Sequence, residues 1–178
     1  MSTHDDVLER RLEDTATTLR TLRDVDAIKA MHRTYLRCLA DRDFAQMASF
    51  FTEDAVMDLR THGVDRGREA IEAHFDRMAQ GPDEHATYLT TSPVIHVDGD
   101  RASGEWTWHR HASDFAVPGG LVRAWGPWLE GRYRCEYARV GSRWLFSSMW
   151  FRVVLPDPDS GADDGPALAV SHDVRTAG

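Results

Sequence analysis

Five aromatic positions spread along the chain could together form a site for a flat, apolar ligand. Three of them carry phenol hydroxyls and two carry indole rings, and they are Tyr35, Tyr88, Trp106, Trp108 and Tyr133. Such rings hold an apolar molecule by stacking, and hydroxyls among them can polarise a carbonyl or a leaving oxygen. The open alternative is that these rings simply fill the core and that their polar atoms find backbone partners.

Two residues near these positions have the chemistry needed to move a proton. His85 precedes Tyr88 after a Gly-Pro loop, and a histidine accepts a proton near neutral pH. It could equally be a solvated loop residue. Asp41 follows the segment that carries Tyr35 and is the second candidate. We therefore interpret Tyr35 and Tyr88 as groups that orient an oxygen, and His85 or Asp41 as the group that moves the proton.

Further polar residues give weaker signals. Asp58 could face inward, contact a substrate and serve as an acid, or it could pair at the surface with Arg60 or Arg66. His109 and His111 stand two residues apart, a spacing that chelates a metal only where a third ligand converges. The chain has no glycine-rich nucleotide motif. We therefore expect neither a metal nor a cofactor.

Composition excludes several classes of protein. The 178 residues carry a formal net charge of −8, so we expect no general attraction for nucleic acid or for an anionic membrane surface. Cys38 and Cys135 are far apart and do not indicate a disulfide framework. The charged N-terminus is unlike a signal peptide, and no apolar run is long enough to span a bilayer. The cytoplasm is the expected compartment.

Apolar periodicity predicts that helices dominate the first half of the chain. The expected helices cover 5–22, a segment that starts at Asp24 as N-cap and runs to about 39, a short stretch over 44–51, and 68–80. A strand-like run covers 55–60, and a loop follows over 62–67. The leucines of 5–22 form a narrow stripe with charged flanks, which indicates packing against a neighbour such as a second copy of the chain.

The second half alternates with period two, as strands do. The expected strands are 86–97, 101–111, a long strand over 121–140 interrupted at 126–127, and 143–155. Strand parity places Trp106, Trp108 and Arg110 on one face. It groups Tyr133 with Cys135 and Tyr137, and it groups Trp144 with Phe146, Ser148 and Trp150. Helices followed by strands predict an α+β fold with helices packed on a curved antiparallel sheet.

Several segments resemble the SnoaL-like branch of the NTF2-like superfamily. They are the opening helices over 24–51, including FFTEDAV at 50–56; GREAI at 67–71; the hairpin over 93–104 with VDGD; and the closing hairpin over 131–146 with RWLF. The resemblance covers roughly residues 24–152 and implies a cone-shaped α+β barrel. It divides the chain into an N-terminal helical extension over 1–23, a SnoaL-like domain over 24–155 and a disordered tail over 156–178.

The dehydratases of this superfamily, such as scytalone dehydratase and bile-acid dehydratase, imply where acid–base residues belong. Their helix tyrosine corresponds to Tyr35, and their following aspartate position is Ala40, next to Asp41. Their strand histidine corresponds to Tyr88, the acid or base of the next strand to Trp106, and an inward polar residue of the closing sheet to Tyr133. Most of the family's acid–base positions therefore carry aromatic residues here.

The resemblance implies two alternative functions. The first is a cofactor-independent lyase, isomerase or cyclase that moves a proton on a hydrophobic ring-containing small molecule, in specialised or steroid- and polyketide-type metabolism. The second is a non-catalytic ligand-binding or structural subunit that resembles a dioxygenase small subunit. In either case, tryptophans on an outer sheet face would favour a homodimer or homotrimer.

Overall fold

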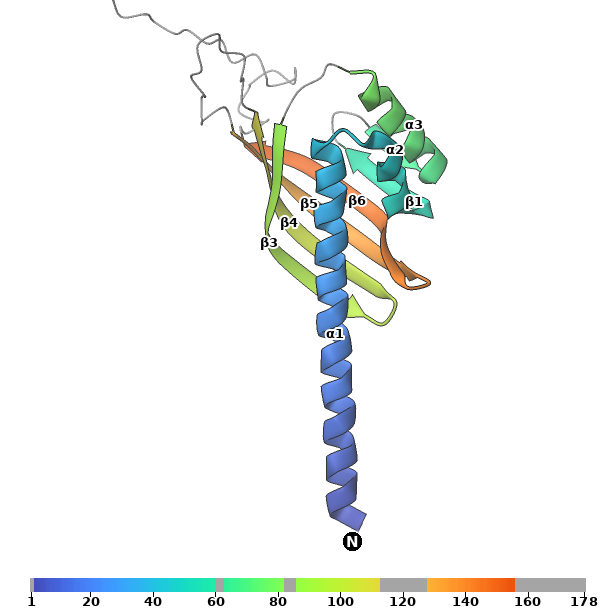
Figure 1. Cartoon of the computed structure of the whole chain (residues 1–178), viewed down its shortest axis with the longest axis vertical. Coiled ribbons are helices and arrows are strands. Elements are labelled where there is room, and N and C mark those ends of the chain that lie inside the picture. The colour runs from blue at the N-terminus through green and yellow to red at the C-terminus, as the bar shows by residue number, and fades with distance from the viewer. Residues whose placement is uncertain (1, 60–62, 82–85, 113–127, 156–178) are drawn as a thin grey trace, which may run out of the picture.

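The computed structural model describes residues 2–59, 63–81, 86–112 and 128–155 (Figure 1). Its elements in chain order are α1 (Ser2–Ala40), α2 (Phe44–Met47), a 3-10 turn (Ala48–Phe50), β1 (Phe51–Leu59), β2 (Gly63–Arg66), α3 (Arg68–Ala79), β3 (Ala86–Asp98), β4 (Arg101–Ala112), β5 (Trp128–Val140) and β6 (Arg143–Leu155). The predicted α+β class is confirmed. The predicted tail at 156–178 and the interruption at 126–127 lie outside the described residues.

The six strands form one sheet in the order β2-β1-β6-β5-β4-β3. The sheet is mixed, because β1 pairs with β6 in parallel while every other neighbouring pair is antiparallel. Strands β1 and β6 are neighbours in the sheet although they are far apart in the sequence. Local sequence patterns therefore do not reveal their parallel pairing. Figure 1 shows the long strands curving around α1, with α2 and α3 at the β1 side.

The first two predicted helices are one continuous helix, so the proposed N-cap at Asp24 is wrong. The chain around residue 24 contains no proline or glycine, and α1 passes through it without a break. The Asp24 carboxylate instead accepts hydrogen bonds from two residues of the sheet, Trp144 Nε1 at 3.2 Å and Arg139 Nη2 at 2.7 Å. These bonds anchor the middle of α1 to the hairpin of β5 and β6.

The other element boundaries agree closely with the sequence pattern, with one omission. Between the helix predicted to end at about 39 and the stretch predicted over 44–51, the chain turns at residues 41–43, and Arg42 has a positive φ of 57°. Strand β1 begins at Phe51, before the predicted start. Part of the predicted loop over 62–67 is the short edge strand β2, whose four residues are too few and too polar to show a period-two pattern. No helix in the described part of the chain has the length and apolarity required to cross a bilayer.

A bulge in β6 changes which side chains face inward. Glu136 pairs with Ser148 and Tyr137 pairs with Phe146, so one extra residue lies between these two pairings on β6. Trp144 and Phe146 are buried, but beyond the bulge it is Met149 that is buried, and Trp150 lies against two arginines. The predicted grouping of Trp150 with Trp144 is therefore wrong.

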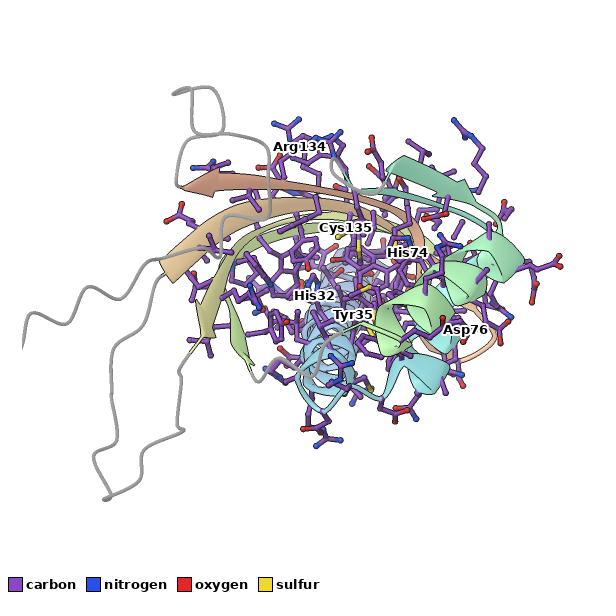
Figure 2. All side chains as sticks on the ribbon, turned by 90° about the horizontal axis from the view of Figure 1, so that it is seen from above. His32, Tyr35, His74, Asp76, Arg134 and Cys135 are labelled. Atoms are coloured by element: carbon purple, nitrogen blue, oxygen red, sulfur yellow. The ribbon has the colours of Figure 1, made fainter. Side chains whose placement is uncertain are left out.

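The core lies between the concave face of the sheet and the helices. Trp106, Trp108 and Tyr133 point into it, and their exposed fractions are about 5% each. Figure 2 shows His32, Tyr35 and Cys135 in the space enclosed by the sheet and α1, whereas Arg134 points away from the opposite face. The tryptophans of β4 therefore face the helices, and they share one face of the strand as parity predicted.

Candidate active site inside the curved sheet

His32 occupies the centre of the buried aromatic cluster. Its side chain comes from the face of α1 that packs on the sheet, and it is fully buried. Its ring centroid lies 4.2 Å from that of Trp106 and 5.4 Å from those of Tyr133 and Phe146. An imidazole is thus surrounded by aromatic rings contributed by three different strands.

One hydrogen-bonded group holds this imidazole in place. Trp106 Nε1 donates to the hydroxyl of Tyr137 at 2.8 Å, and this hydroxyl lies 3.4 Å from His32 Nδ1. Gly104 provides the room, since a Cβ there would lie 3.0 Å from Tyr137 Cε2 and 3.2 Å from Trp106 Nε1. Trp106 and Tyr137 together hold the Nδ1 edge of the His32 ring. The other ring nitrogen, Nε2, remains as the atom that could contact a ligand.

Burial sets the protonation states of the interior. Desolvation lowers the pKa of His32 to about 3, so the imidazole is neutral at physiological pH. Desolvation raises the pKa of Tyr35, Tyr133 and Tyr137, and it raises the pKa of Cys135 to about 12. Among these groups, only His32 is in its deprotonated form at neutral pH and offers a basic lone pair.

Two polar atoms in this interior have no hydrogen-bond partner among the described residues. They are Nε2 of His32 and Nε1 of Trp108, and both are fully shielded from solvent. An unpaired buried polar group costs about 1–3 kcal/mol. A ligand oxygen that reached either atom would recover that energy, which makes these atoms the most informative feature of the site.

The predicted aromatic residues are brought together in two connected groups. Tyr35 and Tyr133 lie beside His32, and the Tyr35 hydroxyl is 3.8 Å from the sulfur of Met149. Tyr88 and Trp108 lie in contact with each other, with centroids 6.0 Å apart. Phe151 of β6 connects the groups, because its ring lies 5.0 Å from Trp108 and 4.6 Å from Tyr133.

The rings occupy the space that they enclose. Their centroid separations of 4.2–6.3 Å are those of packed aromatic pairs, and Tyr35, Trp106 and Tyr133 are almost completely buried. Tyr88 and Phe151 are partly exposed. A groove of about 340 Å³ lies beside Tyr88, between α1 and the edge strand β3. A ligand in this groove would contact Tyr88, and it would have to displace packed rings to reach His32.

The remaining predicted residues lie apart from this cluster or outside the described residues. Asp41 is exposed in the turn after α1. Asp58 forms an ion pair with Arg152 at 3.0 Å. Asp58 therefore pairs with an arginine, as one of the two predictions for it said, but the described partner, Arg152, is not one of the two arginines that were predicted. His85 lies outside the described residues, so its role stays a prediction.

Sequence reasoning missed His32, Tyr137 and Gly104. His32 lies one turn after Ile28 and one turn before Leu36, on the apolar face of α1, and that position was the signal available. Tyr137 has the same parity as Tyr133, which indicates an inward position but not a hydrogen-bond partner. Gly104 leaves room for the side chain of Tyr137 on the neighbouring strand, and the sequence does not show which side chain lies there.

A family comparison matches this architecture. Residues 20–149 match the family described as a SnoaL-like domain. The chain belongs to the SnoaL-like family. No match exists among curated proteins.

Solved structures confirm the NTF2-like fold. One similar structure is an NTF2-like protein with a cystatin-like fold from Novosphingobium aromaticivorans, which has 18% identity and a TM-score of 0.63 over 85% of this chain and 92% of that one. Another, a candidate scytalone dehydratase from the same organism, has 18% identity and a TM-score of 0.62 over 75% and 86%. A third, a candidate aromatic ring hydroxylase also from this organism, has 21% identity and a TM-score of 0.62 over 76% and 92%. At these identities the likeness establishes the fold alone.

Proposed function

We propose that this SnoaL-like protein is a cofactor-independent lyase, isomerase or cyclase that moves a proton on a hydrophobic ring-containing small molecule. The observation that carries the proposal is the neutral imidazole of His32, buried among aromatic rings with its Nε2 unpaired within the described residues. Aromatic walls suit a flat ring system, and an unpaired nitrogen suits a hydroxyl or carbonyl oxygen on it.

His32 takes the role of proton acceptor in this proposal. The low pKa that burial gives it makes it a weak base, but an oxygen that gains negative charge beside it would raise that pKa during reaction. The Tyr137–Trp106 pair orients the ring, and the indole Nε1 of Trp108 can donate to a second substrate oxygen. Tyr88 keeps its predicted role of orienting the substrate, at the partly exposed edge of the cluster.

The decisive experiment replaces His32 with phenylalanine, which keeps a ring of similar size and removes both nitrogens. We would assay wild type and H32F on a panel of cyclic ketones, secondary alcohols and polyketide-like rings, following dehydration or isomerisation by absorbance. Removing a general base lowers kcat about 100- to 10,000-fold. The matched control is H96F, because His96 is exposed on β3. Turnover that survives H32F at the wild-type rate would contradict the role of His32.

A ligand-binding or structural subunit is the second candidate, and a specific observation favours it. The interior rings are packed against one another, and Asp41 is exposed, so the described site has no strong acid–base pair. Tryptophan fluorescence separates the candidates, since Trp106 and Trp108 line the cluster. Saturable quenching by ring compounds without turnover of any of them would favour the binding function.

A further inference from the structure

The N-terminal half of α1 extends beyond the rest of the molecule (Figure 1). Residues 6–23 are all exposed, although the helix continues unbroken to Ala40. Of the nine large apolar residues that are exposed in the described part of the chain, five lie on this segment: Val7, Leu8, Leu12, Leu19 and Leu22. Most helical stability in proteins comes from packing of an apolar face, so a partner that covered these side chains would stabilise the segment.

The leucines form one stripe, and it faces away from the sheet. Leu8, Leu12, Leu19 and Leu22 follow steps of four and three residues, with Thr15 completing the pattern. Leu19 precedes the buried Ile28 by about two and a half helical turns, so these two side chains lie on opposite sides of α1. The stripe, which we call the leucine stripe, is therefore not directed at the chain's own core.

We propose that the leucine stripe binds the leucine stripe of a second copy of this chain in an antiparallel coiled coil, giving a homodimer. A second copy offers the same narrow apolar seam, and a two-fold axis perpendicular to the helices makes the contact self-complementary. This dimer is separate from the chemistry proposed for His32.

Charged residues on α1 favour an antiparallel arrangement of the two helices over a parallel one. Along α1 the stripe continues through Asp26, Lys29 and Arg33, and each is at least partly exposed. In a parallel pair each of these residues would face its own copy across the axis, which places like charges together. An antiparallel pair avoids all three contacts.

The antiparallel alignment also creates favourable contacts. Placing Leu12 of one copy against Leu22 of the other sets Leu19 against Thr15. The same alignment brings Glu9 of each copy beside Arg23 of the other, at positions that flank the apolar seam. Both residues are exposed in the single chain. Two oppositely charged pairs therefore flank the seam.

The outer face of the sheet is a poorer surface for self-association. Trp150 lies there, but its ring is covered by two guanidinium groups, Arg134 at 4.9 Å and Arg152 at 4.6 Å. Arg152 also pairs with Asp58, and Arg134 lies 3.8 Å from Glu105. The outer sheet surface around Trp150 is thus a charged one, and of the two self-contacts expected from the sequence we favour the one on α1.

The first test measures the mass of the full chain in solution by sedimentation equilibrium. Wild type is expected at twice the 20.1 kDa of one chain, and L19E at the mass of one chain. The matched control is T17E, which places the same new charge on the opposite side of the helix and is expected to stay dimeric. Circular dichroism checks that every variant stays folded, since Leu19 and Thr17 are both exposed.

The second test determines the direction of the helices by reversing charges. E9R and R23E alone are each expected to raise the dimer dissociation constant roughly tenfold or more, while the double variant E9R/R23E returns toward wild type. A parallel dimer would show no such recovery. A monomeric or trimeric wild type, an L19E variant that remains dimeric, or a double variant no tighter than the singles would overturn the proposal.

Discussion

The hydroxyl of Tyr137 connects the sheet to the imidazole on α1. It accepts the indole hydrogen bond of Trp106 and lies within reach of His32 Nδ1, and burial raises its own pKa. Cys135 also hydrogen-bonds with Tyr137. Several polar atoms thus share one buried oxygen, so its removal affects more than one neighbour.

Replacing Tyr137 with phenylalanine is expected to lower the free energy of unfolding by about 1–3 kcal/mol. The ring still fills its space, but Trp106 Nε1 loses its acceptor while it stays buried. Urea unfolding at neutral pH measures the change. Tyr88→Phe is the control, and because Tyr88 is partly exposed we expect about 0.5 kcal/mol or less. Equal losses for the two variants would show that the shared hydroxyl has no special role.

The low pKa of His32 predicts how stability depends on pH. The unfolded chain binds a proton at His32 below about pH 6.5, whereas the folded chain does not until about pH 3. Acid therefore favours the unfolded state through this range, and stability rises with pH. Between pH 7 and pH 5, wild type is expected to lose about 2 kcal/mol more stability than H32F. Denaturant titrations at both pH values test this, and identical losses would contradict the burial of a neutral imidazole.

At the scale of elements, α1 is held to the sheet by an ion pair as well as by its apolar face. The Asp24 carboxylate pairs with Arg139, whose ring-stacking partner Trp144 donates to the same carboxylate. The side chains of Asp24 and Arg139 are 17% and 27% exposed, so water screens the pair only in part. Hydrogen bonding to Asp24 also raises the pKa of Arg139.

The D24N variant is expected to be less stable than wild type by about 1–2 kcal/mol. Asparagine keeps the size of the side chain but removes the charge that Arg139 and Trp144 contact. D26N makes the same chemical change two residues later on the exposed side of α1, and there we expect less than about 0.5 kcal/mol. Thermal unfolding of both variants at low protein concentration separates these values. A D24N variant as stable as D26N would mean that apolar packing alone holds the helix.

At the scale of the whole molecule, the described chain consists of a packed body and a projecting helix. Strands β1, β4, β5 and β6 and the C-terminal part of α1 supply most of the buried residues, whereas residues 6–23 bury none. The predicted extension over 1–23 thus lies mostly within one exposed half of α1.

A chain that begins at residue 20 is expected to fold with a Tm within a few degrees of the full chain at low concentration. It keeps Asp24, Ile28 and His32, and the side chains of residues 6–19 that it loses are all exposed. A chain that begins at residue 30 also loses the buried Ile28 and the bonds of Asp24, and it is expected to unfold far more easily. Circular dichroism melting curves measure both. A large loss in the first truncation would show that the projecting half stabilises the body.

Much of the fold follows from local patterns in the sequence. Alternation over 101–111 predicted the strand and the shared face of Trp106 and Trp108, because successive side chains of a strand point to opposite faces. The structure shows that this face points toward the helices. The turn at Asp98-Gly99-Asp100 was equally readable, and Gly99 there has a positive φ of 57°. Strand alternation and hairpin turns depend on residues that are close together in the sequence, so a single amino-acid sequence is enough to predict them.

The tertiary structure alone decided the contacts between distant segments. The parallel pairing of β1 with β6, the bulge that turns Trp150 outward, and the attachment of Asp24 to Arg139 each depend on residues far apart in the chain. The same is true of the candidate site. Its histidine looked like one more residue of an amphipathic helix, and it became the centre of an aromatic cluster only when three strands packed against that helix. Periodicity specifies which face of an element is buried, whereas the partner that buries it is set by packing in three dimensions.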